Sequence, residues 1–305
     1  MQRRLLELLI CPRCLPAEKP LRATLRDLRD GDVVAATLTC TSCAAAYPVR
    51  DGIAELLAAP HHADQYATPQ RLAAYLWSHY ADLDGDPDAH HAFTAWGELL
   101  AGCGGPLLDT GCAVGRLSFE ATRHAELVVG VDLSLNFIQA ARTLARAGRL
   151  PYAPVIEGEL TEARLARLPA DLLRERVEFV VADAQALPFA SGTFATATSL
   201  NLLDRVPMPR HHLGELNRTI RATDATLLVA DPWSWTESPA FASAWLGGCA
   251  TGPNAGRSLV NLERLLAGEL SPPWRIAAAG RIDWTLRTHR NHFELIRSDY
   301  LLARR

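Results

Sequence analysis

The stretch LLDTGCAVGR, from Leu107 to Arg116, decides the fold, because a short apolar run ends in an acid and leads into a loop of small residues. Gly111, Ala113 and Gly115 stand two apart, a spacing that lets backbone amides approach a bound ligand closely. Loops of this kind follow a strand at the carboxyl edge of a parallel sheet. The loop alone leaves open whether its ligand is a phosphate, a dinucleotide or a molecule without phosphate.

Beyond residue 105, short β-rich runs alternate with helical segments. This alternation predicts an α/β fold whose mostly parallel sheet has right-handed crossovers. Two further runs near the end, with only a short turn between them, predict an antiparallel pair at one edge of the sheet. The expected strands are 106–111, 126–132, 177–184, 194–203, 226–233, 281–290 and 292–304, and the expected helices are 115–124, 135–147 and 209–221.

Four of the seven cysteines form two C-x2-C pairs, Cys11 with Cys14 and Cys40 with Cys43. Each pair turns the chain tightly enough to put two thiolates on one metal ion. Together they predict a tetrahedral four-cysteine zinc site that has no open position for water. The residues between the pairs alternate like a hairpin, with a turn at 30–32. A domain of this size has little core of its own, so zinc would supply much of its folding free energy.

Around the second pair, LTCTSCAAAYPVRDGIAELL resembles the small zinc-ribbon partner protein that binds and activates several tRNA and protein methyltransferases. The resemblance covers about residues 5–58. We therefore expect a zinc ribbon at 1–58, a helical, aromatic connector or cap at 59–104 and the main domain at 105–305. Paired histidines at 61–62, 90–91 and 211–212 have no carboxylate spacing that would organise a second metal site.

The residues at the end of the glycine loop limit which ligands it can bind. A phosphate-binding NTPase loop ends in Gly-Lys-Ser/Thr, whereas Gly115 is followed by Arg116 and Leu117. A dinucleotide loop reads G-x-G-x-x-G, which the spacing does not match. The pattern Asp-x-Gly-x-(Gly/Ala)-x-Gly instead resembles motif I of the class I methyltransferases. That resemblance implies that the loop lies under the amino-acid and ribose parts of S-adenosylmethionine.

Polar residues at the ends of successive strands support this cofactor. Asp132 ends the second strand, 21 residues after Gly111, where an acid can accept both ribose hydroxyls. Asp183 ends the third strand, where the methyltransferases bind the adenine amino group, and Asn201 follows the fourth strand at the substrate edge. The expected cofactor-binding residues are Asp109, Gly111, Cys112, Ala113, Gly115, Asp132, Leu133, Asp183, Ala184 and Asn201.

Several segments resemble the mercaptohistidine N-methyltransferase domain of ovothiol biosynthesis: DTGCAVGRLSFEATR, NLLDRVP, DPWSWTE, WLGG and LRTHRNHFE. The likeness extends over roughly 105–304 and includes the long connection at 149–176, nearly twice what a plain crossover helix needs. It implies methylation of a small polar molecule, such as a histidine- or thiohistidine-like imidazole or a related heteroaromatic amine. The N-terminal ribbon departs from that family.

The chemistry assigns roles to residue types. A neutral imidazole must be held in one tautomer by an acceptor such as a carboxylate, and a substrate carboxylate would pair with arginine. Indole rings after the fifth strand can either wall the pocket and contact the sulfonium or pack as core. The expected catalytic residues are Asn201, Asp204 and Arg205, and the expected substrate-binding residues are Trp233, Trp235, Arg287 and Arg290.

Composition narrows the function classes. A net charge of −3 and a pI of about 6.4 give no basic footprint for nucleic acid. No stretch reaches the roughly 18 to 20 apolar residues of a membrane span, and cysteines without an export signal predict a cytoplasmic protein. One alternative is an RNA or protein methyltransferase that uses the ribbon to bind substrate. The Asn/Asp-Pro-Pro-aromatic motif of enzymes that methylate exocyclic base amines is, however, absent at 201–204. The other alternative is a non-catalytic regulatory subunit, and the sequence does not predict the oligomeric state.

Overall fold

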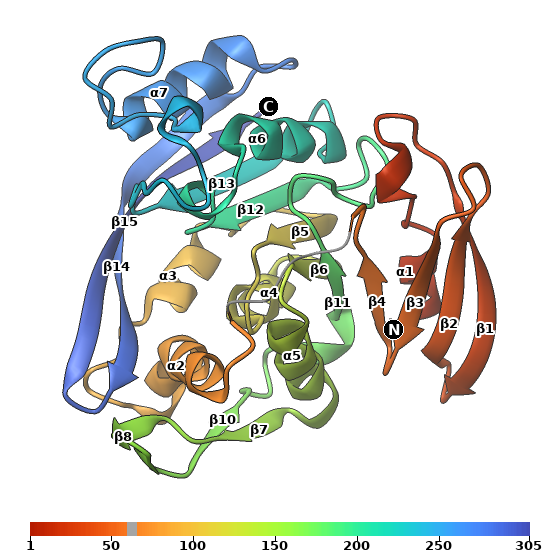
Figure 1. Cartoon of the computed structure of the whole chain (residues 1–305), viewed down its shortest axis with the longest axis horizontal. Coiled ribbons are helices and arrows are strands. Elements are labelled where there is room, and N and C mark those ends of the chain that lie inside the picture. The colour runs from red at the N-terminus through yellow and green to blue at the C-terminus, as the bar shows by residue number, and fades with distance from the viewer. Residues whose placement is uncertain (60–65) are drawn as a thin grey trace.

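The computed structural model describes residues 1–59 and 66–305, and an 11-stranded mixed sheet runs through this described part of the chain (Figure 1). Its strands lie in the spatial order β1-β2-β3-β4-β11-β6-β5-β12-β13-β15-β14. Their bounds are β1 Leu21–Arg29, β2 Asp32–Cys40, β3 Ala46–Arg50, β4 Ile53–Leu56, β5 Pro106–Thr110, β6 Leu127–Asp132, β11 Val177–Ala182, β12 Thr196–Leu200, β13 Thr226–Asp231, β14 Arg275–His289 and β15 His292–Arg304.

The centre of the sheet is parallel, as the alternation of strands and helices predicts. β5 pairs in parallel with β6 and β12, β11 pairs with β6, and β12 pairs with β13. The two last strands form the predicted antiparallel pair, and β15 joins them to β13. The α/β prediction is therefore confirmed.

The helices are α1 Arg3–Leu6, α2 Pro69–Tyr80, α3 Ala92–Glu98, α4 Arg116–Glu120, α5 Leu135–Ala147, α6 Pro209–Thr219 and α7 Ser258–Arg264.

Two hydrophobic cores lie on opposite faces of the sheet, because neighbouring strand residues point to opposite sides. Leu107 of β5 and Val128 of β6 are buried in the core that helices α2 to α5 cover. Their neighbours Leu108 and Val129 are buried in the second core, which α6, α7 and part of the N-terminal region cover. In Figure 1, α2, α4 and α5 lie below the central strands and α6 lies above them. Strands buried on both faces explain their nearly continuous apolar sequences.

The N-terminal ribbon and the main domain share one sheet. β1 to β3 form an antiparallel meander that continues into β4. β4 then runs parallel to β11, with Ala54 opposite Val180 and Leu56 opposite Ala182. Both Ala54 and Leu56 are fully buried. The expected boundary at residue 58 therefore follows a strand that is hydrogen-bonded into the sheet of the main domain.

The connector and the long connection contain short elements of their own. The connector consists of α2, a 3-10 turn at Ala81–Asp84 and α3, and the histidine pair at 61–62 lies outside the described residues. The connection at 149–176 forms two small antiparallel pairs, which lie near α2 and α5 in Figure 1. These pairs consist of β7 Arg149–Tyr152 with β10 Arg164–Arg167, and β8 Val155–Glu157 with β9 Leu160–Thr161.

Candidate active site

The glycine loop follows β5 and adopts the strained backbone that its composition suggests. Gly111, Ala113 and Gly115 have φ angles of 68°, 46° and 84°, in the left-handed region that favours glycine. A Cβ atom on Gly115 would lie 2.7 Å from a ring carbon of Phe179, so the loop also packs too closely there for a side chain. The thiol of Cys112 is buried and its pKa is raised far above its usual value by that burial, which keeps it protonated.

Asp132 locks this loop to the next strand. One carboxylate oxygen accepts the backbone N–H of Ala113 at 2.9 Å, and the other accepts the N–H of Ser134 at 2.9 Å. The Ser134 hydroxyl in turn caps α5 by accepting the N–H of Phe137 at 3.3 Å. Leu133, between these residues, is half-buried. The acid expected to hold the ribose thus lies beside the loop expected to hold the rest of the cofactor.

Asp109 lies beneath the loop and has a different set of contacts. Its two oxygens accept the hydroxyls of Ser118 at 2.6 Å and Thr198 at 2.7 Å, and the residue is 2% exposed. Burial raises its pKa to about 6, against the opposing effect of the two hydroxyl donors. Asp109 therefore joins β5 to α4 and β12 from inside the fold.

The next expected positions also lie at the carboxyl ends of parallel strands. Asp183 follows β11 and accepts the backbone N–H of Gln185 at 2.8 Å, while the carbonyl of the buried Ala184 contacts Nδ1 of His212 at 3.0 Å. Asn201 follows β12 with a φ angle of 54°, and its N–H donates to the carbonyl of Ala230 at 2.7 Å. We call the loop 111–115, Asp132, Asp183, Ala184 and the segment 201–205 together the strand-end site.

Within this site, Asp204 forms part of a buried acidic pair. One of its oxygens accepts the N–H of Ser234 at 2.8 Å, and the other lies 3.1 Å from Nε of the exposed Arg205 without a hydrogen-bond geometry. Its backbone N–H donates to Asp231, the last residue of β13, at 3.3 Å. Burial raises the pKa of both carboxyl groups, and the charge of Asp204 raises that of Asp231 further.

Asp231 is the residue that the sequence analysis missed. It is fully buried, and it accepts the N–H of Trp233 at 2.9 Å as well as that of Asp204. The signal that could have found it is an acid at the end of an apolar run, as used for Asp132, but the strand predicted here ran on to residue 233, whereas β13 ends at Asp231. Its role here is to join the turn after β12 to the turn after β13.

The two expected tryptophans lie beyond Asp231. Their rings are 6.4 Å apart, and the ring of Trp235 stacks on that of Trp245 at 6.1 Å. Nε1 of Trp235 donates to the hydroxyl of Ser258, the first residue of α7, at 2.8 Å. Both Trp233 and Trp235 pack against the core under α6 and α7. Of the two roles open at the sequence level, these contacts are those of core packing.

Arg287 and Arg290 lie away from Asn201, on β14 and in the turn after it, so their expected contact with the substrate stays a prediction. Arg287 is buried and pairs with Glu162 of the long connection at 2.9 Å, and Arg290 is exposed between β14 and β15. The reason is register. Ser298, which contacts Asn201, lies opposite residue 282, so Arg287 is five residues farther along the strand, roughly 17 Å away.

An aromatic group of the connector lies against the strand-end site. The ring of Tyr66 is 5.1 Å from that of Phe137 and 5.7 Å from that of Tyr75, and its carbonyl accepts Nδ2 of Asn136 at 3.0 Å. Burial raises the pKa of Tyr66, and the charge of Arg205 opposes that rise. Tyr66 therefore packs against the start of α5, and both Tyr66 and Tyr75 lie within electrostatic reach of Asp132 and Arg205.

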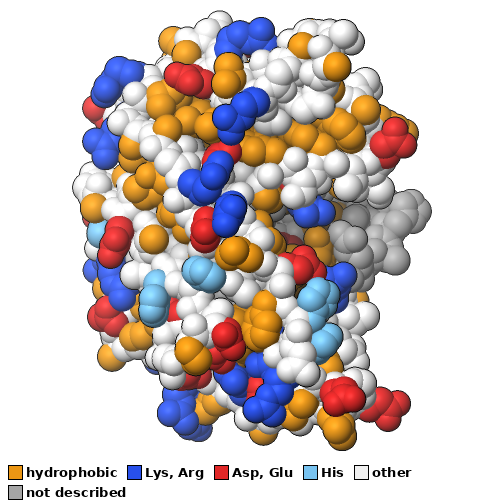
Figure 2. Space-filling model, turned by 90° about the vertical axis from the view of Figure 1, so that its left-hand side faces the viewer, with side chains coloured by type: hydrophobic (Ala, Val, Ile, Leu, Met, Phe, Trp, Pro, Cys, Tyr) orange, Lys and Arg blue, Asp and Glu red, His pale blue; other side chains and the backbone are white. Residues whose placement is uncertain are grey.

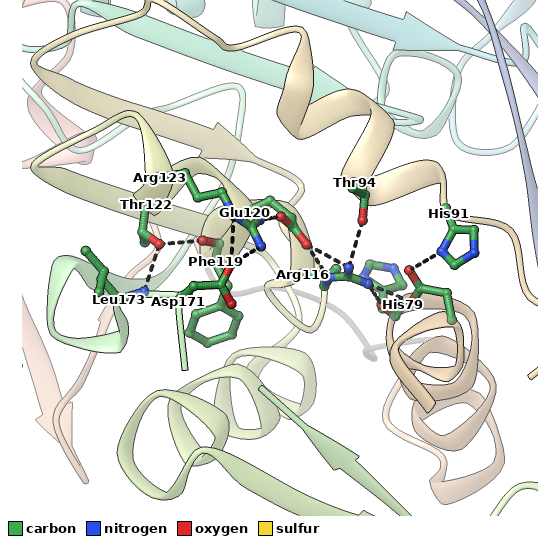
Figure 3. Close-up of polar contacts among 11 residues, drawn as sticks. His79, His91, Thr94, Arg116, Phe119, Glu120, Thr122, Arg123, Asp171 and Leu173 are labelled. Atoms are coloured by element: carbon green, nitrogen blue, oxygen red, sulfur yellow. Dashed lines mark hydrogen bonds and ion pairs between the residues drawn. The ribbon is translucent and has the colours of Figure 1, made fainter. Parts of the chain in front are cut away.

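A buried arginine ties the connector to the loop (Figure 3). Arg116, directly after Gly115, donates to Asp82 at 2.7 Å, to Glu120 at 2.6 Å and to the carbonyl of His79 at 2.7 Å. All three side chains in this ionic group are almost completely buried. Ion pairs of this kind are costly to break, because one lost partner leaves the others charged and buried. The start of α4 is thus fixed to α2 and its following turn.

The four paired cysteines come together in the ribbon. Their sulfur atoms all lie within 4.8 Å of one another, with Cys11 and Cys43 3.7 Å apart and Cys14 and Cys40 3.8 Å apart. The N–H groups of residues 42 and 43 point at the sulfur of Cys40 from 3.4 Å. Four soft sulfur donors with amide support fit a zinc ion.

The other chemistry-bearing residues do not form a second centre of this kind. Within residues 1–59 and 66–305, the four cysteines are the one group of His, Cys, Asp and Glu side chains with metal-binding spacing. On the face shown in Figure 2, histidine side chains lie among arginines and acids. The described helices include none long and apolar enough to cross a membrane.

Two family models match the chain. Residues 108–224 match the methyltransferase domain family, and residues 2–52 match the Trm112p-like protein family. The chain is an S-adenosylmethionine-dependent methyltransferase with a zinc-binding ribbon. The first match covers the loop, Asp132, Asp183 and the turn after β12, which is the whole strand-end site. The comparison with curated proteins gave no match to this methyltransferase.

Three of the solved structures that match this chain are methyltransferases or contain one. An S-adenosylmethionine-dependent methyltransferase of Methanosarcina mazei is 20% identical, with a TM-score of 0.41, over 65% of this chain and 91% of that one. Magnesium protoporphyrin IX methyltransferase of Synechocystis, with bound S-adenosylmethionine, is 16% identical, with a TM-score of 0.40, over 81% and 87%. The Haloferax volcanii complex of the Trm112 methyltransferase activator with a methyltransferase is 20% identical, with a TM-score of 0.34, over 52% and 60%.

Proposed function

We propose that this methyltransferase acts on a small polar molecule, and that its acceptor is a histidine- or thiohistidine-like imidazole or a related heteroaromatic amine methylated on nitrogen. The observation that carries the proposal is the turn 201–205. It offers a buried carboxylate on Asp204, one of whose oxygens has no hydrogen bond within the described residues, next to an exposed guanidinium on Arg205. An amino-acid-like heteroaromatic molecule has both a ring N–H and a carboxylate for these groups.

S-adenosylmethionine supplies a methyl group on a positively charged sulfur atom. In our proposal, Asp132 holds the ribose hydroxyls, the loop 111–115 lies under the amino-acid part, and Asp183 with Ala184 binds the adenine. Both Ala113 N–H and Ser134 N–H already hold the carboxylate of Asp132, so it is oriented before the ligand arrives. Positioning of this kind supplies much of the catalysis of an in-line displacement.

Asp204 and Arg205 would orient the acceptor. The Asp204 carboxylate accepts the N–H of the neutral ring, which leaves the lone pair on the other nitrogen free to attack the methyl carbon. As the N–C bond forms, the C–S bond breaks, and the ring N–H proton passes to Asp204. The raised pKa of this buried carboxyl group favours the transfer. With Arg287 and Arg290 elsewhere, Arg205 is the arginine that we assign to the substrate carboxylate.

The rest of the chain would shape this site. We propose a ribbon at 1–58, a connector at 59–104 and the catalytic domain at 105–305, with Tyr66 of the connector close to the acceptor. Trp233 and Trp235 would act through the position of the turn after β13, since both pack against core. A zinc site made of free thiols suits a reducing compartment, so we propose that the enzyme works in the cytoplasm.

The test separates small acceptors from large ones. The enzyme is incubated with methyl-labelled S-adenosylmethionine and, in parallel, with a small-molecule cell extract, total RNA or total protein. We expect label in the small-molecule fraction, and an Asp204→Asn variant should remove most of it while S-adenosylmethionine affinity is retained. Label confined to RNA or protein would favour a macromolecular substrate bound with help from the ribbon. Cofactor binding without transfer to any fraction would favour a regulatory subunit.

A further inference from the structure

Asn201 is held by a hydrogen-bonded chain that begins two strands away. Nε1 of Trp284 on β14 donates to the hydroxyl of Ser298 on β15 at 3.2 Å. The hydroxyl of Ser298 donates in turn to Oδ1 of Asn201 in the turn after β12. Trp284 is 7% exposed and Ser298 is 0% exposed, so water does not compete for either bond. One of the two lone pairs on the side-chain oxygen of Asn201 therefore accepts a hydrogen bond from within the fold.

The chemistry of the two donors fixes the orientation of the amide. An indole N–H can only donate, so Ser298 must accept from Trp284 and still place its own hydrogen on another acceptor. Among the described residues, Oδ1 of Asn201 is the acceptor that takes it. If the amide were turned over, two N–H groups would meet the Ser298 oxygen, and the serine hydrogen would have no acceptor. A buried donor left in that state is unfavourable.

Nδ2 of Asn201 is left with two hydrogens to give. It has no hydrogen-bond partner within residues 1–59 and 66–305, and the residue is half-buried. A Cβ atom on Gly111 would lie 3.0 Å from the side chain of Leu202, the residue that follows Asn201. Asn201 therefore lies beside the glycine loop. Asp204, three residues after Asn201 in the same turn, is buried. Asn201 thus presents donors at the place where the methyl acceptor must enter.

We infer that the chain Trp284–Ser298–Asn201 sets the specificity of the site: Asn201 binds the acceptor through Nδ2, so it recognises a carboxylate or carbonyl oxygen rather than an exocyclic amine. An amine held by an asparagine would need Oδ1 to accept its N–H, and it would have to share that oxygen with Ser298, which already uses one of its two lone pairs. The inference deepens the proposed function and rests on it for the size of the acceptor. The polarity at Asn201 itself rests on the hydrogen bonds alone.

The first experiment reads the polarity without any acceptor. The enzyme is prepared with 15N-labelled asparagine and saturated with S-adenosylhomocysteine, and the side-chain amide signal of Asn201 is identified by its loss in Asn201→Asp. We expect Ser298→Ala to shift this signal, because the bond to its carbonyl is lost. Thr219→Val is the matched control, since it removes a fully buried hydroxyl from the end of α6. An Asn201 signal unchanged in Ser298→Ala overturns the inference.

The second experiment measures transfer with methyl-labelled S-adenosylmethionine, using whichever extract fraction takes up label. We expect Ser298→Ala to lower kcat/KM about three- to tenfold, the worth of one lost hydrogen bond. Asn201→Asp, which replaces the donors by a charged acceptor, should lower it further, mainly through KM for the acceptor. Affinity for S-adenosylhomocysteine should stay unchanged in Ser298→Ala and in Thr219→Val.

The identity of the methylated product distinguishes failure of the small-molecule proposal from failure of the inference about Asn201. Mass spectrometry of the labelled product locates the methyl group and the groups around it. A methylated exocyclic amine overturns the inference about Asn201, whether the acceptor is small or large. Label in RNA or protein at an oxygen or ring nitrogen contradicts the small-molecule proposal and leaves the polarity at Asn201 supported.

Discussion

The backbone N–H of Ala113 donates a hydrogen bond to the carboxylate of Asp132 across 2.9 Å, and this bond joins the glycine loop to the end of β6. The second oxygen of the same carboxylate accepts from the start of α5. Loop, strand and helix therefore meet at one side chain. Because the carboxylate is fixed from two sides, it can receive ribose hydroxyls with little loss of conformational entropy.

Replacing Asp132 should weaken cofactor binding. Asp132→Ala removes the acceptor proposed for the ribose, so we expect the binding free energy of S-adenosylmethionine to fall by about 1–3 kcal/mol, the cost of leaving buried polar groups unpaired. Isothermal titration calorimetry measures this loss. Asp27→Ala, at a partly exposed acid of β1 far along the chain from the glycine loop, is the matched control and should bind as the wild type does. Unchanged affinity in Asp132→Ala would remove this residue from the site.

The conformation of the glycine loop predicts that one substitution stabilises the protein. Ala113 has a φ angle of 46°, where a Cβ atom costs roughly 1 kcal/mol that glycine does not pay. Ala113→Gly should therefore raise the melting temperature by a few degrees, against the usual direction for this substitution. Ala145→Gly, inside α5, should lower stability by about 1 kcal/mol. Thermal unfolding that places both variants below the wild type would contradict the strain at Ala113.

The ribbon should depend on its metal. Cys40→Ser replaces one of four sulfur donors, so we expect the zinc content, near one ion per chain in the wild type, and the melting temperature to fall together. Metal analysis and thermal unfolding of the same samples test this. Cys249→Ser, at a cysteine outside the cluster, should change neither. Full zinc occupancy in Cys40→Ser would rule out the four-cysteine site.

Asp109 should make stability depend on pH. A carboxyl group whose pKa is raised on folding holds its proton more tightly in the folded state. Its contribution to the free energy of unfolding therefore falls as the pH rises from 3.8 to about 6. His79 and His212, whose pKa values burial lowers to about 3 and about 4, act in the opposite direction.

Asp109→Asn removes the first of these contributions and keeps the second. In urea titrations at several pH values between 4 and 6, the free energy of unfolding of this variant should rise more steeply with pH than that of the wild type. The substituted amide has the same shape as the carboxyl group, and both neighbouring hydroxyls can re-pair with it. Parallel curves for the two proteins would show that Asp109 does not change its pKa on folding.

Arg116 should be among the most sensitive positions in the connector interface. Arg116→Met leaves the buried Asp82 without its arginine and Glu120 with Arg123 as its remaining arginine, and breaking a buried ionic group in this way typically costs roughly 3–5 kcal/mol. We expect a large fall in the free energy of unfolding, measured by urea titration. Arg29→Met, at an exposed pair on β1, should change it by less than about 1 kcal/mol. Equal effects of the two substitutions would be inconsistent with a buried ionic group.

Local sequence patterns carried most of the fold. The helix predicted at 135–147 is present with those limits, because Ser134 caps its start and Gly148, with a positive φ, ends it. The strands of the main domain are apolar on both faces and bounded by turn residues, so they could be recognised one by one. The positions of Asp132 and Asn201 follow from the rule that parallel strands end at the same edge.

Features that depend on pairing between distant segments could not be read in this way. The register of β15 against β13 brings Ser298 near Asn201, and the register of β14 against β15 leaves Arg287 farther along its strand. Nothing in either strand alone determines that register. The pairing of β4 with β11 is likewise non-local, since the connector and the first half of the main domain separate the two strands in the chain. Asp231 was missed for another reason, because an acid before proline reads equally well as part of a turn.

The shared sheet has a consequence for how the ribbon and the catalytic domain associate. Ala54 meets Val180 within one chain, so the local concentration of the ribbon at this edge is set by the covalent link rather than by the amount of protein. Dilution cannot separate the ribbon from the catalytic domain. No excess of ribbon is needed to keep the edge of β11 covered. Their proportion is one to one in every molecule made.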